Sequence, residues 1–213
     1  SDFQNPTQVA SIQRAGRLFY CETDIRTSLS RWVSLTRPEV DPDAHYVQPG
    51  WLGRPTVEDS IAVLKMVFAR ILVSVAANWW FDLWGGWYDD PRIMEEISKM
   101  RGIADESIAW DRSPVNEIAV IIDDASLCFM QVGNRLSSWL IMQQLPELGR
   151  IGAPIGYYAL DDLDLLPPHK MMVFLNCFAP TPVHLRRIEK LKADNRVLVW
   201  VYAPGIYRNG QLD

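Results

Sequence analysis

The chain has 213 residues, of which 48% are hydrophobic and 22% charged, and its formal net charge is −5. These values are typical of a globular protein with one large domain or two small ones. The mild acidity and the lack of basic blocks argue against nucleic acid or an anionic membrane surface as a partner.

Cysteine and histidine are sparse. Cys21, Cys128 and Cys177 are widely spaced, with no CxxC pair and no metal-ligand spacing to a histidine. The sequence therefore predicts neither a metal site nor a disulfide framework. Free thiols are typical of a reducing compartment, which favours a cytoplasmic location.

Motifs for cofactors and for membrane insertion are also missing. The phosphate motifs GxGxxG and GxxxxGK and the serine elbow GxSxG do not occur. We therefore expect no nucleotide cofactor and no serine hydrolase. The apolar stretch 61–81 contains Lys65 and Arg70, so it does not predict a membrane span.

The chain opens with a polar stretch, residues 1–15, for which we expect irregular or weakly helical structure. Residues 17–22 predict a short buried strand that ends in a polar Glu-Thr-Asp. Residues 27–54 predict a long loop, because prolines and glycines punctuate them. Loops of this length in compact domains are usually functional or disordered.

A helix is predicted next, because Thr56-Val57-Glu58-Asp59 resembles a capping box and apolar residues follow at helical spacing from 61 to 75. Residues 79–81 predict a second strand, with Asp82 at its end. The order strand, helix, strand forms one crossover, which implies that the two strands are parallel.

Asp90-Pro91 predicts the start of a further helix, with Asp90 as N-cap and Pro91 at the first helical position. We expect this helix to end near Arg112-Ser113-Pro114. A domain boundary is predicted between residues 88 and 114. We accordingly assign residues 1–90 to a first segment and residues 91–213 to a second domain.

The second domain alternates strands and helices. Its predicted strands are 117–122, 155–159, 171–176 and 197–202, and its predicted helices are 136–145 and 182–193, the latter capped by Thr181. Strands this apolar and β-branched are covered on both faces. We therefore expect an α/β fold, a doubly wound parallel sheet with helices on both faces.

Tryptophan is concentrated between residues 78 and 91, where four tryptophans, a tyrosine and three carboxylates fall within fourteen residues. Such crowding has two explanations, because Trp is large and costly to leave exposed. One is a sugar site, in which aromatic faces stack on pyranose rings and carboxylates bind hydroxyls. The other is a Trp-rich packing junction between two domains.

Functional groups of parallel α/β folds gather where strands end at their carboxyl side. In the first segment this rule selects a group of charged and aromatic residues: Glu22, Asp24, Arg26, Asp82, Trp84 and Trp87. A carboxylate beside an arginine at a strand end could be a glycosidase nucleophile with a lowered pKa. A structural ion pair that anchors the loop is the alternative, and the residues alone favour it.

The strand ends of the second domain offer weaker candidates. Cys177 follows an apolar strand, but no glycine flanks it to form a tight elbow, so we interpret it as a small buried residue. Asp161-Asp162 is interpreted as part of a solvated turn. His45, His169 and His184 are isolated in the sequence, and each is interpreted as structural.

Two motifs of the first segment, Phe19 to Thr27 and Trp80 to Pro91, resemble proteins related to glycoside hydrolase family 42 β-galactosidases. The family has a (β/α)8 barrel followed by a flavodoxin-like domain, which is related to class I glutamine amidotransferases and is known as the trimerisation domain. The second half of the chain is similar to that domain from Ser113-Pro114 through Tyr158-Ala159 to Ala203-Pro204-Gly205.

The resemblance implies that residues 17–82 are the last two strands of a barrel and that Glu22 is at the position of the nucleophile. It implies retaining chemistry, in which two carboxyl groups lie about 5 Å apart, with the general acid on an earlier strand. A barrel needs roughly 200 residues, so the resemblance implies a partial barrel here. Ala203-Pro204-Gly205 stands where amidotransferases place their nucleophilic cysteine, so glutaminase activity is not expected.

Two functions follow as expectations. The first is a fragment of a retaining glycoside hydrolase related to β-galactosidases, with a carbohydrate substrate, that is inactive alone because the general acid is missing. The second is a non-catalytic module that serves oligomerisation or carbohydrate binding. The family precedent implies a homo-oligomer, with a trimer favoured.

Overall fold

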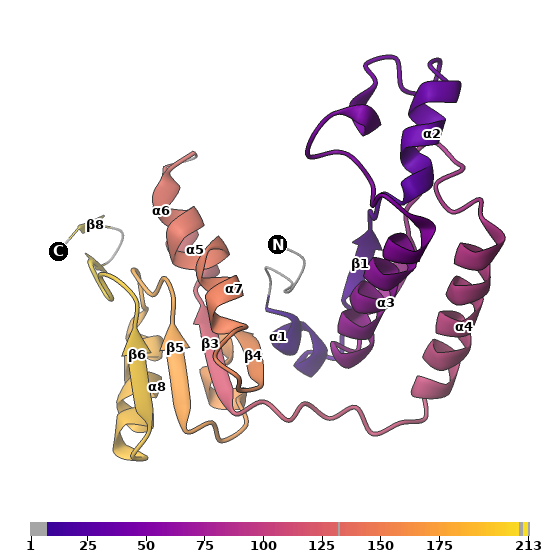
Figure 1. Cartoon of the computed structure of the whole chain (residues 1–213). Coiled ribbons are helices and arrows are strands. Elements are labelled where there is room, and N and C mark those ends of the chain that lie inside the picture. The colour runs from indigo at the N-terminus through magenta and orange to yellow at the C-terminus, as the bar shows by residue number, and fades with distance from the viewer. Residues whose placement is uncertain (1–7, 132, 209–210, 213) are drawn as a thin grey trace. The chain divides into compact units, whose positions relative to one another are not determined.

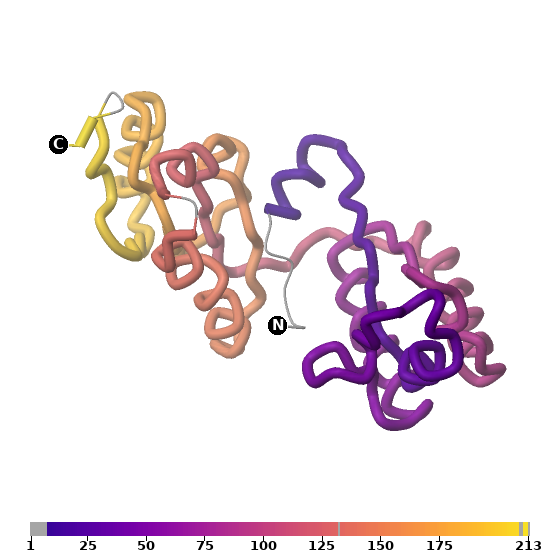
Figure 2. The backbone as a smooth tube through the Cα atoms, turned by 90° about the horizontal axis from the view of Figure 1, so that it is seen from above, coloured from indigo at the N-terminus to yellow at the C-terminus, as the bar shows by residue number. Residues whose placement is uncertain are grey.

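The computed structural model describes residues 8–131, 133–208 and 211–212. Contacts within the chain divide it into two compact units (Figures 1 and 2). The first unit runs from Leu18 to Arg112 and is called here the tryptophan-rich unit. The second, the sheet unit, combines the residues up to Arg17 with those from Ser113 onward.

The tryptophan-rich unit is built on two short parallel strands. Strands β1 (Tyr20–Thr23) and β2 (Ala77–Trp80) pair from Tyr20 opposite Ala77 to Thr23 opposite Trp80. Helix α3 (Val57–Val73) connects them and lies alongside β1 in Figure 1. The predicted crossover with parallel strands is confirmed.

The segment predicted as a long loop contains regular structure. Helix α2 (Ser28–Thr36) and the short 3-10 helix η1 (His45–Val47) lie within residues 27–54. Thr27 caps α2, because its side chain accepts a hydrogen bond from the backbone N–H of Leu29. The prediction of an irregular stretch was wrong here because the prolines and glycines all follow α2.

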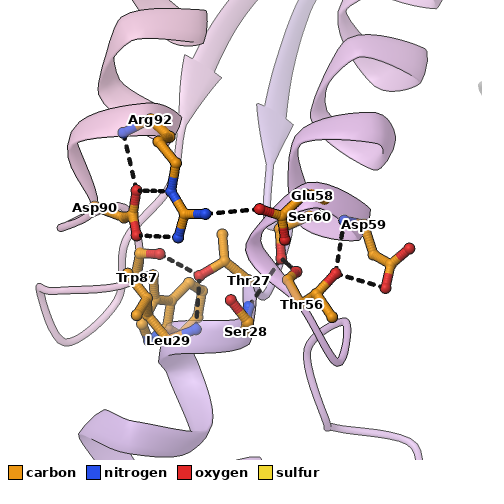
Figure 3. A network of polar contacts seen from close by, with 10 residues as sticks. All are labelled: Thr27, Ser28, Leu29, Thr56, Glu58, Asp59, Ser60, Trp87, Asp90 and Arg92. Carbon is orange, nitrogen blue, oxygen red and sulfur yellow. Dashed lines mark hydrogen bonds and ion pairs between the residues drawn. The ribbon is translucent and has the colours of Figure 1, made fainter.

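Two helix starts agree with the sequence. The Thr56 hydroxyl accepts the Asp59 N–H at 3.1 Å at the start of α3, and the Asp90 carboxylate accepts the Arg92 N–H at 2.9 Å at the start of α4 (Pro91–Ser107) (Figure 3). Helix α4 packs on α3 and so belongs to the tryptophan-rich unit. The division of the chain therefore falls after Arg112 and not at residue 90.

The tryptophan-rich unit has a core of its own. Its buried residues come from the helices, the loop and the Trp-rich segment: Val33, Tyr46, Leu64, Trp87, Tyr88, Ile93 and Met100. The rings of Tyr46 and Trp87 meet edge to face at 5.1 Å. Part of the Trp-rich segment is thus core, as expected for residues of this size.

The sheet unit contains four parallel strands in the order β4-β3-β5-β6. Their bounds are Ile118–Ile122 for β3, Ile155–Ala159 for β4, Met171–Phe174 for β5 and Val197–Trp200 for β6. A short antiparallel pair, β7 (Tyr207–Arg208) and β8 (Gln211–Leu212), follows. The predicted α/β class with a parallel sheet is confirmed.

Helices cover both faces of this sheet (Figure 1). On one face Ala119 and Ile121 of β3 pack with Ile188 and Leu191 of α8 (Pro182–Ala193). On the other, Ile118, Val120 and Ile122 pack with Leu140 and Ile141 of the π-helical turn η2 (Ser138–Met142). Three short elements complete the two layers: α5 (Asp124–Leu127), α6 (Arg135–Ser137) and α7 (Gln144–Leu148). The single helix predicted over 136–145 is therefore interrupted.

Helix α1 (Val9–Arg14) packs against β4 of the sheet unit. Ala10 lies in the sheet core, and the backbone N–H of Ala159 donates to the Ser11 hydroxyl at 2.9 Å. The 3-10 helix η3 (Leu160–Leu165) continues from β4 over the same face. The start of the chain thus groups with its second half rather than with β1. Within the described residues, no helix is long and apolar enough to span a membrane.

Candidate functional site

The candidate site lies where β1 and β2 end. Because the strands are parallel, the residues that follow each of them emerge at the same edge, and the N–H of Phe81 still donates to the Thr23 carbonyl at 3.1 Å. The Tyr88 hydroxyl joins the two exits by contacting the carbonyls of Ile25 at 3.3 Å and Phe81 at 3.1 Å. This arrangement brings residues 24–26 together with residues 82–88.

Arg26 is the centre of the site. Its Nη2 donates to Asp24 Oδ2 at 3.1 Å. Its guanidinium carbon lies 4.6 Å from the centre of the Trp51 ring, 5.7 Å from that of Tyr46 and 5.9 Å from that of Trp87. The cation is therefore held by one carboxylate and three aromatic faces.

Asp82 and Trp84 join the same cluster. Asp82 Oδ2 accepts a hydrogen bond from the backbone N–H of Trp87 at 3.1 Å, and Trp84 Nε1 donates to the Tyr46 hydroxyl at 2.9 Å. We call the whole set the Arg26 cluster: Asp24, Arg26, Tyr46, Trp51, Asp82, Trp84 and Trp87. Five of the six residues selected from the sequence are in it.

Glu22 is the residue that lies apart. It is exposed on β1, directly opposite Trp79 of β2. Its neighbour Cys21 faces α3, where Arg70 Nη2 lies 4.0 Å from the cysteine sulfur. Because side chains alternate along a strand, Glu22 lies on the face of the strand pair that is turned away from α3. The same face carries the stacked rings of Tyr20 and Trp79.

The Arg26 cluster contains buried polar atoms without a hydrogen-bond partner in the described part of the chain. They are the second carboxylate oxygens of the two aspartates and two ring or guanidinium N–H groups: Asp24 Oδ1, Asp82 Oδ1, Arg26 Nε and Trp87 Nε1. Most buried polar groups in proteins are paired. The cluster therefore retains hydrogen-bonding capacity that its own side chains do not use.

Two phenols near these charges remain protonated at neutral pH. Burial raises the pKa of Tyr88, and the carboxylates of Asp82 and Asp24 raise it further. Burial also raises the pKa of Tyr46, against the opposing effects of the Trp84 hydrogen bond and of Arg26. Both hydroxyls are thus neutral donors at the edge of the site.

A buried carboxylate holds the loop that supplies Tyr46. Asp41 accepts hydrogen bonds from the Ser34 hydroxyl, from the backbone N–H of His45 at 3.1 Å and from that of Tyr46 at 3.3 Å, and its Oδ1 lies 2.9 Å from His45 Nδ1. Burial alone would raise the pKa of Asp41, but these hydrogen bonds lower it to about 2. The ionised carboxylate therefore fixes η1 relative to α2.

Gly53 brings the rest of that loop against the end of β1. A Cβ atom at this position would lie 1.8 Å from the Thr27 carbonyl oxygen and 2.9 Å from that of Arg26. No side chain fits in that space. The close approach of the two backbones therefore requires glycine and places Trp51 beside Arg26.

A polar network includes Thr27 and Trp87, which follow the two strands (Figure 3). The Thr27 hydroxyl contacts the Trp87 carbonyl, and the Ser28 N–H donates to the Ser60 hydroxyl of α3 at 2.9 Å. Arg92 of α4 bridges to Glu58 of α3 at 2.6 Å. These contacts connect the exits of both strands to the starts of both helices.

Tyr46 and Trp51 were not selected from the sequence, because they lie in the segment predicted as a loop. The available signal was the presence of two large aromatic residues among the prolines and glycines of that segment. Large aromatic residues in a long loop indicate either packing or binding. Here Tyr46 is buried, whereas Trp51 is partly exposed.

Several polar residues at the strand ends of the sheet unit have structural partners. Asp123 and Asn176 exchange two hydrogen bonds of 2.8 Å between the ends of β3 and β5. Burial, with a further contribution from Asp123, raises the pKa of Cys177 to about 12, so its thiol is not a nucleophile at neutral pH. His184 completes a capping box with Thr181 and lies 2.7 Å from Asp161, so Asp161 is paired and is not only part of a solvated turn.

Comparisons with family models, with curated proteins and with solved structures found no match to this chain. Among the described residues, no group of three or more His, Cys, Asp or Glu side chains could hold a metal ion.

Proposed function

We propose that the tryptophan-rich unit binds a carbohydrate at the carboxyl ends of β1 and β2, as part of a protein related to glycoside hydrolases of the β-galactosidase type. The observation that carries the proposal is the convergence of Asp24, Arg26, Asp82 and Trp84 on one edge of a parallel pair. This edge is where α/β folds place their ligands.

The side chains suit a sugar. Carboxylate oxygens accept hydrogen bonds from hydroxyl groups, and the Asp24 side chain, which is 37% exposed, supplies such an acceptor beside Asp82. Aromatic rings carry a negative face that attracts the C–H groups of a pyranose ring. Trp84 is 37% exposed and offers such a face beside the aspartates.

Glu22 is the proposed nucleophile of the related enzymes, a role that comes from the resemblance of residues 19–27. Its exposed position next to Trp79 leaves it accessible to a sugar on the open face of β1 and β2. Retaining hydrolysis needs a second carboxyl group about 5 Å away. The resemblance places that group on another barrel strand, so we propose that the 213-residue chain binds without hydrolysing.

The sheet unit is the basis of a second candidate function, assembly. Its order β4-β3-β5-β6 equals the first four strands of the flavodoxin-like order 2-1-3-4-5, which supports a relation to the trimerisation domain. Trp139 and Met142 of η2 are exposed, as residues of an interface between copies would be in one copy alone. Light scattering on the purified chain tests this: a monomer at all concentrations would contradict assembly.

The test of carbohydrate binding is an NMR titration of the whole chain with methyl β-galactopyranoside and methyl β-glucopyranoside. We expect the chemical shift of the Trp84 indole N–H to change on binding, because this group either loses its hydrogen bond to Tyr46 or gains a contact with the sugar. The double variant Asp24→Asn, Asp82→Asn should weaken binding about tenfold, because amides accept hydrogen bonds from hydroxyls less strongly. Unchanged spectra with both sugars would refute the proposal.

A further inference from the structure

Trp51 presents an aromatic surface beside the Arg26 cluster that the proposed function leaves unassigned. Trp51 is 46% exposed. The Arg26 guanidinium lies over the Trp51 ring, with its carbon 4.6 Å from the ring centre, and the Trp51 and His45 rings form an edge-to-face pair with centres 6.2 Å apart and an interplanar angle of 69°. The exposed part of the ring therefore lies outside the area that the guanidinium covers.

Two backbone contacts fix the position of Trp51 in the loop, and the Arg26 side chain supports its ring. The backbone N–H of Trp51 donates to the backbone carbonyl of Gln48 at 3.1 Å, and this bond closes a turn. Two residues later, Gly53 locks the backbone against that of Thr27. The Arg26 side chain that supports the ring is itself fixed by its ion pair with Asp24.

A ring held this way suits binding. A ligand that stacks on a pre-ordered side chain does not have to immobilise it, so less conformational entropy is lost on association. An exposed tryptophan in a long surface loop is free to change rotamer, and it would be a poorer platform. The support by Arg26 thus distinguishes Trp51 from the other exposed tryptophans of the unit, which are Trp32, Trp79, Trp84 and Trp110.

We infer that Trp51 is the platform on which a pyranose ring stacks, with its accessible face as the contact surface. This inference rests on the proposed carbohydrate site and adds the residue that orients the sugar. The surrounding charges define the class of sugar. Within the Arg26 cluster two carboxylates, Asp24 and Asp82, stand against one guanidinium, that of Arg26, so an uncharged pyranose is favoured over a uronic acid.

The test compares variants of the whole chain by NMR titration with methyl β-galactopyranoside, methyl β-glucopyranoside and methyl β-glucuronide. We expect Trp51→Ala to weaken binding of the neutral sugars about tenfold, since the stacking face is removed. Trp51→Phe keeps an aromatic face and should stay within about threefold. The matched control is Trp110→Ala, because Trp110 is 48% exposed and lies beyond the end of α4.

Each outcome has a defined meaning. If the wild-type chain binds a neutral sugar and Trp51→Ala binds it equally well, the inference is overturned while the carbohydrate site stands. If the glucuronide binds as tightly as the neutral sugars, the assignment of the sugar class is wrong. If the wild-type chain binds none of the three, the proposed function fails and the role of Trp51 fails with it. Near-UV circular dichroism of each variant verifies that the fold is intact.

Discussion

Arg26 is held by a carboxylate and by aromatic rings at the same time. The pair Asp24 and Arg26 was predicted either as a structural ion pair or as part of a sugar site. The structure contains the ion pair, at 3.1 Å, and also surrounds the guanidinium with Tyr46, Trp51 and Trp87. A planar cation of this kind stacks on aromatic faces, which a lysine ammonium does less well.

Replacing Arg26 with lysine therefore tests how much the stacking contributes. We expect Arg26→Lys to lower the free energy of unfolding by about 1 kcal/mol, because the charge remains but the planar contacts with the rings are lost. Urea denaturation measures the change. Arg31→Lys on the exposed side of α2 is the matched control, and an equal effect of both substitutions would argue against a special role for the rings.

Asp41 gives the tryptophan-rich unit an acid sensitivity. Its pKa is about 2 in the folded chain, against 3.8 for an unperturbed carboxyl, so its ionised form stabilises the fold above pH 3.8. That contribution, about 2 kcal/mol, should be lost as the pH falls from 3.8 towards 2. Asp41→Asn should remove this part of the pH dependence in urea titrations, whereas Asp43→Asn, an exposed neighbour, should retain it.

At the scale of elements, the segment between α2 and α3 decides the shape of the site. It contributes Tyr46 and Trp51, and it is held by the Asp41 hydrogen bonds at one end and by the close approach of Gly53 at the other. Neither set of contacts can be recognised from a sequence motif. Asp41 bonds to residues on two different elements, and Gly53 is one of several glycines between residues 50 and 90.

Gly53→Ala should therefore be destabilising. The added methyl group would lie 1.8 Å from the Thr27 carbonyl oxygen, and the loop would have to move away from β1, at a cost of about 1–3 kcal/mol. Gly102→Ala on α4 is the matched control, because no atom lies within 4 Å of its Cβ position. That change should stabilise the helix by about 0.5–1 kcal/mol. Thermal unfolding of both variants measures the two changes in stability, which should have opposite signs.

Considered as a whole molecule, the chain consists of two units with separate cores, and their acid responses should differ. In the sheet unit His169 is buried beside the Tyr158 ring, and both of its ring nitrogens are without a hydrogen-bond partner among the described residues. Burial lowers the pKa of His169, and the nearby cations Arg196 and Arg14 lower it further, against an opposing contribution from the Pro167 backbone. The folded sheet unit therefore holds this imidazole neutral.

We accordingly expect acid to destabilise the sheet unit before the tryptophan-rich unit. Below pH 6.5 the unfolded chain binds a proton at His169 that the folded chain does not, so stability falls as the pH falls. The Asp41 effect begins only below pH 3.8. Amide exchange at Ile121 and at Leu64, one buried residue in each core, follows the two units separately. His169→Gln should remove the loss of stability that begins below pH 6.5 in the sheet unit. Simultaneous loss of protection at both amides in the wild-type chain would contradict the prediction.

The sequence alone determined the features whose causes are local. Helix starts at Thr56, Asp90 and Thr181 follow from side chains that bond to backbone groups two or three residues away. Apolar periodicity gave the α/β class and the parallel strands. Those strands in turn predict that Asp24, Arg26 and Asp82 lie at one edge, since parallel strands end on the same side.

Only the tertiary structure decided the contacts between distant segments. Trp51 lies on Arg26, and α1 packs on β4, where Ser11 and Ala159 are 148 positions apart in the chain. Glu22 lies apart from the cluster because strand alternation places its side chain on the open face. These placements depend on which surfaces bury each other, and that balance is a property of the folded chain rather than of any short stretch of it.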